Sequence, residues 1–227
     1  MIAAASSRRA IALWLLIVAA MIFVMVVLGG TTRLTRSGLS IVEWRLLEGT
    51  LPPLGDAHWI ELFDKYKLTP EYRKVNVGMD LAGFKEIFWL EYLHRLWGRL
   101  IFFAALIPLL WFLWRKQIEP PLVRRMVAVP LLVAANGVLG WLMVASGLVD
   151  IPRVSPYRLT AHLGLAIAIY GYVLWLALGL LYPASGRPEW SPLRRAGIAV
   201  AVLVFFMILT GGFVAGTKAG YAFNTFP

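Results

Sequence analysis

The stretch AIALWLLIVAAMIFVMVVL, residues 10–28, is an unbroken apolar run of the length that a helix needs to cross a bilayer. Four further runs follow, at residues 84–114, 126–149, 159–182 and 196–215, of which the first is uninterrupted only after Leu100. Inside a bilayer only helices and closed barrels satisfy the backbone, and these runs lack the alternation of barrel strands. The sequence therefore predicts an all-α membrane protein with five spanning helices.

The composition excludes a soluble globular protein and any cysteine-based site. Of the 227 residues, 60% are hydrophobic and 15% are charged, whereas a soluble domain is nearer half apolar and a quarter charged. The chain has no cysteine, so it offers neither a disulfide framework nor a thiolate ligand for a metal. Any metal must therefore be held by other side chains.

The net charge of +10 is explained by membrane topology. Loops rich in Lys and Arg remain in the cytoplasm, so we predict that the N-terminus is inside and that the long first loop, residues 29–83, is outside. Because the charge needs no polyanion, we expect the lipid bilayer and no nucleic acid as a partner. The basic residues on which this orientation rests lie in the first segment and in two alternate short loops: Arg8, Arg9, Arg115, Lys116, Arg124, Arg125, Arg187, Arg194 and Arg195.

The long first loop carries its own helical signal. Residues 57–67 are amphipathic, and proline- and glycine-containing turns flank them. We expect one or two helices lying on the outer face, with Trp59, Phe63 and Tyr66 at the level of the lipid headgroups. A surface cap without chemistry and a substrate lid are both open interpretations of this loop.

The chain contains a candidate internal repeat at an offset of 182 residues (211 minus 29). We predict a four-helix transmembrane bundle over residues 1–195, and over residues 196–227 the first helix of a second, repeated four-helix bundle whose other three helices lie beyond Pro227. Chance recurrence of glycine-rich helix exits is the alternative. At this offset Gly29, Gly30, Thr35, Arg36, Gly38 and Trp44 fall on Gly211, Gly212, Thr217, Lys218, Gly220 and Phe226.

Two of the three histidines are placed at matching depth. His94 and His162 each lie where an even-numbered helix enters from the outside, whereas His58 lies in the loop. Four-helix packing can bring two such helices together, and a pair of imidazoles suits a haem iron better than zinc, which needs four ligands. Gly98 and Ala166, one turn further along, leave room for a flat ring. Histidines that only hydrogen bond near the interface are the alternative.

Charged side chains near the histidines are candidate site residues, because ionisable groups at membrane depth are expensive. Glu91 shares a helical face with His94 and Arg95, and it is either an acid–base group beside a bound ring or a carboxylate paired with Arg95. Arg95 and Arg99 are candidates to bind haem propionates, and pairing of Arg99 with Glu91 or snorkelling is the alternative. We interpret three further residues mainly as close-packing positions: Asn136, Gly137 and Gly140.

Several motifs together resemble the haem A synthase family, the membrane enzymes that convert haem O to haem A for cytochrome oxidase. The first loop lacks a cysteine pair, which is more similar to the proteobacterial and mitochondrial branch. The matching motifs are GGTTRLTRSGLS (29–40), PEY (70–72), VNVGM (75–79), EYLHR (91–95), GWLMVASGL (140–148), YRLTAHL (157–163) and AGYAFNTFP (219–227).

The resemblance implies an eight-helix protein of two halves in the bacterial inner membrane, each half with a histidine pair. It implies that His94 and His162 flank the iron of haem O, that Glu91 lies near the methyl group oxidised to formyl, and that a haem b is held by the second half. It also implies an association with haem O synthase or cytochrome oxidase assembly proteins, and a homo-oligomer is a further expectation. A bis-histidine haem carrier or electron-transfer protein is the main alternative, and a transporter is a weaker one.

Overall fold

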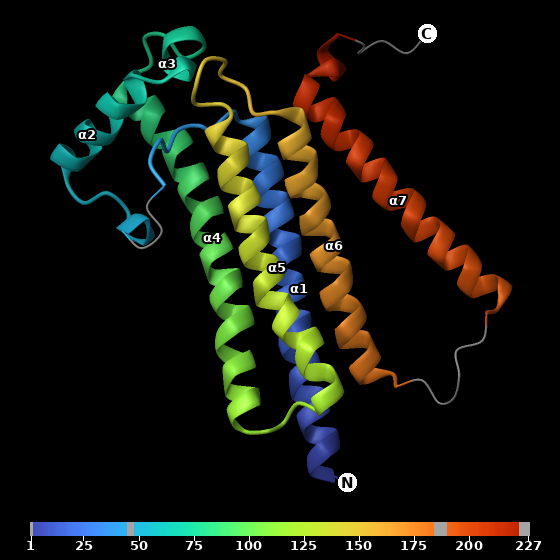
Figure 1. Ribbon diagram of the computed structural model, residues 1–227. Coiled ribbons are helices and arrows are strands. Elements are labelled where there is room, and N and C mark those ends of the chain that lie inside the picture. Colours follow the sequence, from blue (N-terminus) through green and yellow to red (C-terminus); the bar gives the residue numbers. More distant parts are fainter. Residues whose placement is uncertain (1, 45–47, 184–189, 223–227) are drawn as a thin grey trace.

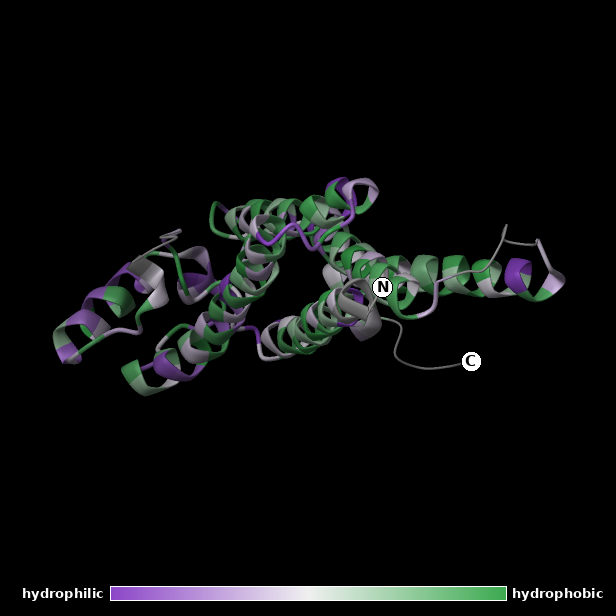
Figure 2. Ribbon diagram, turned by 90° about the horizontal axis from the view of Figure 1, so that it is seen from below, coloured by the Kyte–Doolittle hydropathy of each residue, from purple (hydrophilic) through white to green (hydrophobic). Residues whose placement is uncertain are grey.

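The computed structural model describes residues 2–44, 48–183 and 190–222, and within these ranges every regular element is a helix. Five helices are long and apolar enough to cross a membrane, which confirms an all-α, multi-pass membrane protein. In Figure 2 hydrophobic residues predominate along them. The five are α1 (Ile2–Leu34), α4 (Leu81–Trp114), α5 (Pro120–Ala145), α6 (Pro156–Leu181) and α7 (Pro192–Thr217).

All five helices begin three or more residues before the apolar runs from which they were predicted, and three of them share one feature at that end. Each of the three begins with a proline, at Pro120, Pro156 and Pro192. Proline suits the first helical turn because its fixed φ is helical and its missing N–H would have no intrahelical partner. At the start of α7, the Ser191 hydroxyl also accepts a hydrogen bond from the amide of Arg194 at 3.2 Å. The helix boundaries therefore follow capping chemistry rather than hydropathy.

Helices α1, α4, α5 and α6 form a four-helix bundle (Figure 1). Helix α1 packs against α4 and α6, and α5 packs against the same two helices, so α4 and α6 stand on one diagonal of the bundle. Its core is apolar away from the long loop, with Leu15, Val18, Ala105 and Val129 fully buried. Among the described residues, the buried polar and charged side chains lie at the end of the bundle near the long loop, so a reactive site is expected at that end.

Helix α7 contacts the bundle through α6 and leans away from it towards its own N-terminus (Figure 1). Small residues allow the contact: a Cβ on Gly212 would lie 3.1 Å from Thr160 Oγ1, and a Cβ on Gly216 would lie 2.8 Å from Pro156 Cα. Close approach at glycines is how membrane helices gain dispersion contacts. Most of the remaining α7 side chains are exposed.

The long loop between α1 and α4, residues 35–80, carries η1 (Glu48–Thr50), α2 (Asp56–Lys67) and α3 (Pro70–Lys74). Helix α2 confirms the helix predicted at residues 57–67. Its aromatic face differs from the expectation, since Trp59, Phe63 and Tyr66 are buried against the first turns of α4 instead of facing lipid headgroups. All three rings contact that of Phe84, with centroids 5.1 Å apart for Phe63 and Phe84. The loop is thus clamped onto α4.

Candidate functional site

The bundle brings the two predicted histidines together. His94 lies on α4 and His162 on α6, the two diagonal helices, and their imidazoles are close enough for a charge on one to affect the other. Helix α4 begins well before His94, so its first three turns stand alongside the long loop, whereas α6 begins only two turns before His162. The two histidines therefore lie at different distances from the N-terminal ends of their helices.

His162 is held in one orientation by α5. Its Nδ1 lies 3.0 Å from the backbone carbonyl oxygen of Asn136. Since that carbonyl can only accept, Nδ1 carries the proton, and Nε2 remains available as a ligand. The ring also lies against Gly140, where a Cβ would stand 3.0 Å from its Cε1. Two of the residues that we interpreted as close-packing positions thus contact the histidine directly.

His94 is placed against α1 in a different way. A Cβ on Gly29 would lie 3.1 Å from His94 Cε1, so the imidazole rests on the bare backbone of that glycine. Among the described residues, no group hydrogen bonds with the buried Nδ1 of this ring. Gly98, which we expected to leave room for a ring, instead faces the Cε of Met25 at 3.2 Å from the position of its Cβ.

The Glu91 side chain is buried and accepts several hydrogen bonds. The exposed fraction of the whole residue is 3%. One carboxylate oxygen accepts from Arg95 Nη2 at 2.6 Å, and the other accepts from the Ser40 hydroxyl at 2.7 Å and the Ile41 amide at 2.8 Å. The contact with Arg95 is the ion pair predicted from their spacing. The two donors from the long loop could not be predicted from spacing, because they are about fifty residues away in sequence.

The guanidinium of Arg95 fastens the long loop to α4. Besides Glu91, it donates to the carbonyl of Ile41 at 2.8 Å and to that of Glu43 at 3.2 Å. It also stands 5.3 Å from the ring centroid of Trp44. The Arg95 guanidinium thus already donates hydrogen bonds to three acceptors within the protein. To bind a propionate it would have to break one of these hydrogen bonds.

A hollow of about 120 Å³ lies between the long loop and α4. Arg95, Arg99 and His58 line it together with Tyr92, which donates a hydrogen bond to the carbonyl of Thr50 at 2.6 Å. Sites for drug-sized ligands usually enclose about 300 Å³ or more. The hollow therefore has room for an anionic substituent but is too small for a whole porphyrin.

The donor set fits a haem better than a bare metal ion. Within the described ranges, no three His, Asp or Glu side chains gather in a group that could hold a metal ion. A porphyrin supplies four equatorial nitrogens, so only two axial ligands are needed from the protein. Two neighbouring imidazoles on diagonal helices, one with a fixed Nδ1 proton and one with an unpartnered nitrogen, meet that requirement.

Glu71 is a second buried carboxylate, which sequence analysis did not single out as a site residue. It lies on α3, is 5% exposed, and accepts a hydrogen bond from the Tyr66 hydroxyl at 3.4 Å. Burial raises the pKa of the Glu71 carboxyl to about 7, and the negative charge of Glu91 adds to the increase, while charges on Lys218 and Arg36 oppose it. In the sequence Glu71 lies within a charged segment of the long loop, and such a segment does not predict a buried side chain.

We expect Glu71→Gln to stabilise the fold above neutral pH. A carboxyl whose pKa rises from 4.5 to about 7 on folding contributes stability that is fully present below the unfolded value and is lost as pH rises through the folded value. The variant should match the parent chain near pH 4.5 and exceed it near pH 8 by up to roughly 3 kcal/mol. Thermal unfolding in detergent across this range is the measurement. Glu61→Gln, at an exposed position of α2, is the control, and equal pH profiles for both variants would contradict the prediction.

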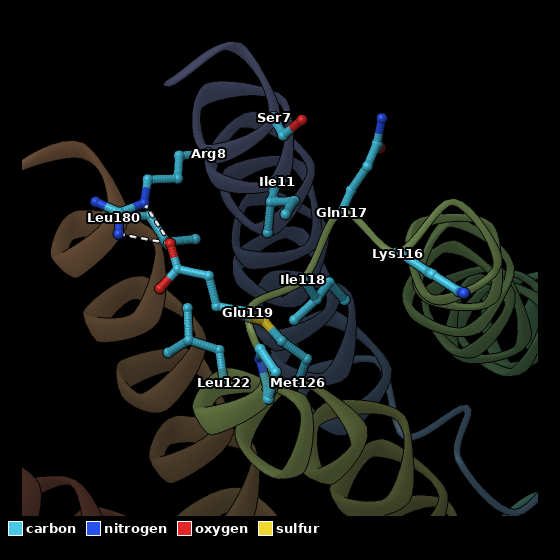
Figure 3. A pocket seen from close by; sticks show the side chains of 11 residues that line it. Ser7, Arg8, Ile11, Lys116, Gln117, Ile118, Glu119, Leu122, Met126 and Leu180 are labelled. Atoms are coloured by element: carbon cyan, nitrogen blue, oxygen red, sulfur yellow. Dashed lines mark hydrogen bonds and ion pairs between the residues drawn. The ribbon is translucent and has the colours of Figure 1, made fainter. Parts of the chain in front are cut away.

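A second hollow, of about 500 Å³, lies at the opposite end of the bundle (Figure 3). The Arg8 guanidinium donates to Glu119 through Nε at 2.9 Å and Nη2 at 2.6 Å, which ties the start of α1 to that of α5. Ile11, Met126 and Leu180 form apolar parts of its wall. The pair is about half exposed, so its contribution to stability is at most about 1 kcal/mol.

These features define a class: a multi-pass, all-α membrane protein with two neighbouring histidines at the loop end of a four-helix bundle. The COX15-CtaA family, described as "Cytochrome oxidase assembly protein", matches residues 12–227. The chain therefore belongs to this family, that of the haem A synthases. No solved structure gives a significant match to the chain.

Similar curated proteins carry the name Heme A synthase. The one from Nitrosospira multiformis is 55% identical over 97% of this chain and 63% of its own length. Those from Paramagnetospirillum magneticum and Nitrosomonas eutropha are 50% and 49% identical, over 64% and 62% of their own lengths. The chain thus spans a little over three fifths of the length of these relatives. Of the motifs that carried the resemblance, the last extends into residues 223–227, which lie outside the described residues, as does Arg187.

Proposed function

We propose that this chain is the substrate-binding portion of a haem A synthase, which oxidises a methyl group of haem O to the formyl group of haem A. The observation that carries the proposal is the pair His94 and His162, on diagonal helices of one bundle in a chain of this family. His162 presents Nε2 because Asn136 fixes its Nδ1 proton. His94 would provide the other axial nitrogen to the iron of haem O.

Glu91 is the proposed acid–base residue of this site. Oxidation of a methyl group to an alcohol with oxygen from water releases two electrons and two protons, and electrons would leave to a haem b outside the described residues. A proton acceptor is therefore needed beside the methyl group. Among the described residues, Oε2 of Glu91 accepts two hydrogen bonds and Oε1 accepts one, so a lone pair of Oε1 remains to take up a proton.

The proposed role of the long loop is to cover the site. Ser40 and Ile41 donate to Glu91, and Arg95 holds the carbonyls of Ile41 and Glu43. This network joins the proposed acid–base residue to the covering segment. Of the two interpretations of this loop, the network supports a substrate lid over a surface cap. Arg99, which lines the adjacent hollow, is the proposed partner of a propionate.

The proposed repeat is supported by matching backbone geometry at the ends of α1 and α7. Arg36 and Lys218, separated by the offset of 182, both have positive φ, 55° and 59°. One residue earlier in each copy, the hydroxyls of Thr35 and Thr217 each donate at 2.8 Å to the carbonyl four residues back. We propose that residues 196–227 begin a second unit equivalent to residues 1–195.

The proposed location is the bacterial inner membrane, with the N-terminus in the cytoplasm and the long loop outside. Support comes from the clustering of Arg8 and Lys116 around the hollow at the N-terminal end of the bundle. Basic residues favour the cytoplasmic side. A haem O synthase or an oxidase assembly protein would meet the chain in the same membrane.

Replacing Glu91 with Gln tests the proposed chemistry. We expect the variant, made in a protein that also contains the proposed haem b site and produced together with a haem O synthase, to retain bound haem O and to lower haem A formation by about 100-fold, the scale on which a proton-transferring residue contributes. Chromatography of haems extracted from the membranes measures both. The substitution keeps the size of the side chain, so packing changes are small.

The main competing function is that of a bis-histidine haem carrier, and the same experiment separates the two. A carrier needs only His94 and His162, so haem O would bind and no haem A would form even with Glu91 present. Unchanged haem A formation in Glu91→Gln would rule out the acid–base role of this residue. Absence of bound haem in the parent chain would contradict both functions.

A further inference from the structure

We infer that Gly29 and Gly140 are positioning residues that set the orientation of the His94 and His162 imidazoles towards a haem iron. The inference rests on the haem binding proposed above and goes beyond it, because it assigns a role to residues that would not touch the haem themselves. Its basis is that each histidine ring lies so close to a glycine of a neighbouring helix that a methyl group there would push the ring by a few tenths of an ångström.

Gly140 gives His162 access to a backbone carbonyl. In an α-helix the side chain of residue i+4 leans over the turn that carries the carbonyl of residue i. In α5, Asn136 is residue i, whose carbonyl accepts the hydrogen bond, and Gly140 is residue i+4, which has no side chain to cover it. A Cβ on Gly140 would stand 3.0 Å, 3.4 Å and 3.6 Å from Cε1, Nδ1 and Nε2 of His162. The missing Cβ therefore lets Nδ1 reach the Asn136 oxygen at 3.0 Å, and this bond sets the direction of Nε2.

Gly29 acts on His94 by contact alone. Its Cβ would stand 3.1 Å from Cε1 and 3.7 Å from Nδ1 of the ring. Among the described residues the buried Nδ1 has no hydrogen-bond partner, so no polar contact at this nitrogen fixes the rotation of the ring. Packing against the glycine backbone is then the main restraint, and a methyl group there displaces the ring by a few tenths of an ångström.

The four residues follow the order of the bundle. Gly29 on α1 supports His94 on α4, and Gly140 on α5 supports His162 on α6. The glycines thus occupy one diagonal of the bundle and the histidines the other. An axial ligand must point at the iron within a narrow range of angles, and residues that orient a ligand change metal affinity by about 10- to 100-fold.

The neighbouring glycines provide matched controls. Within the described part of the chain, a Cβ would meet no atom within 4 Å on Gly30, beside Gly29 in α1, or on Gly137, three residues before Gly140 in α5. Alanine in place of glycine raises helix propensity equally at all four positions. Any effect on general helix stability therefore appears in control and test variants alike, and only an effect through the histidine rings distinguishes them.

The test is a titration of the 227-residue chain in detergent with iron protoporphyrin IX, followed by absorption and by electron paramagnetic resonance of the ferric form. We expect Gly140→Ala to weaken binding about 10-fold and to shift the low-spin signal. Gly29→Ala should shift that signal with a smaller loss of affinity. Gly30→Ala and Gly137→Ala should leave both unchanged. Circular dichroism verifies that all variants retain their helices.

The result that overturns the inference is a low-spin signal in Gly29→Ala and Gly140→Ala that matches the parent chain, or equal changes in the controls. The histidine variants separate this failure from failure of the proposed function. If His94→Ala and His162→Ala lose the signal while the glycine variants keep it, only the positioning role fails. If the histidine variants keep it, the assignment of both ligands fails as well.

Discussion

Replacing either His94 or His162 with alanine is expected to remove tight haem binding. Each variant takes away one of the two proposed axial ligands, at a site where the described residues provide no cluster of three His, Asp or Glu side chains. Loss of a residue that only orients a ligand costs about 10- to 100-fold in metal affinity, so loss of the ligand itself should exceed about 100-fold. The haem-to-protein ratio after purification and the absorption spectrum measure the effect.

His58→Ala is the matched control for these variants. His58 is exposed on α2 and lines the small hollow beside Arg95 and Arg99. We expect the haem content of this variant to equal that of the parent chain. Loss of haem in His58→Ala with retention in His94→Ala would move the site into that hollow and contradict the assignment.

Replacing Arg95 with Met should destabilise the chain by about 3–5 kcal/mol, the range measured when one partner of a buried ion pair is removed. The side chains of Arg95 and Glu91 are only 11% and 4% exposed. The variant leaves the Glu91 carboxylate buried without its cation and also frees the carbonyls of Ile41 and Glu43. The expected results are a lower midpoint of thermal unfolding and faster proteolysis of the long loop.

The double variant Arg95→Met with Glu91→Gln tests whether the unpaired Glu91 carboxylate causes the loss of stability in Arg95→Met. An amide in place of the Glu91 carboxylate carries no charge, so we expect the double variant to recover part of the stability lost by Arg95→Met alone. Lys65→Met provides a contrast, because Lys65 pairs at 2.7 Å with a Glu61 side chain that is 58% exposed. Such exposed pairs contribute little, because water and salt screen the charges. An equal loss in Lys65→Met and Arg95→Met would show that burial of the pair is unimportant.

Local sequence patterns predicted those parts of the site that lie within one helix. The spacing of Glu91 and Arg95 places them on one face, and the structure pairs them at 2.6 Å. Spacing within one helix does not predict which residues of different helices contact each other. Gly140 gave only the general signal of a small residue in a membrane helix, although it contacts His162. Which small residue faces a histidine depends on how far each helix extends and how it is rotated.

The aromatic face of α2 illustrates the same limit. Its periodicity predicted a helix with one apolar side, and α2 confirms it. Periodicity does not say whether that side meets lipid or protein, because both are apolar. In the structure the apolar side of α2 packs against protein: Tyr66 and Phe84 are both completely buried, with ring centroids 5.2 Å apart.

The sequence by itself determined that the chain spans a membrane with five helices and carries a histidine pair on two of them, because length and hydropathy are properties of single segments. Only the tertiary structure decided how these histidines are held, which donors surround Glu91, and that Glu71 is buried. These features depend on contacts between residues far apart in the chain, such as Ile41 with Glu91 and Gly29 with His94. Such contacts form only when packing brings the long loop and the neighbouring helices against α4.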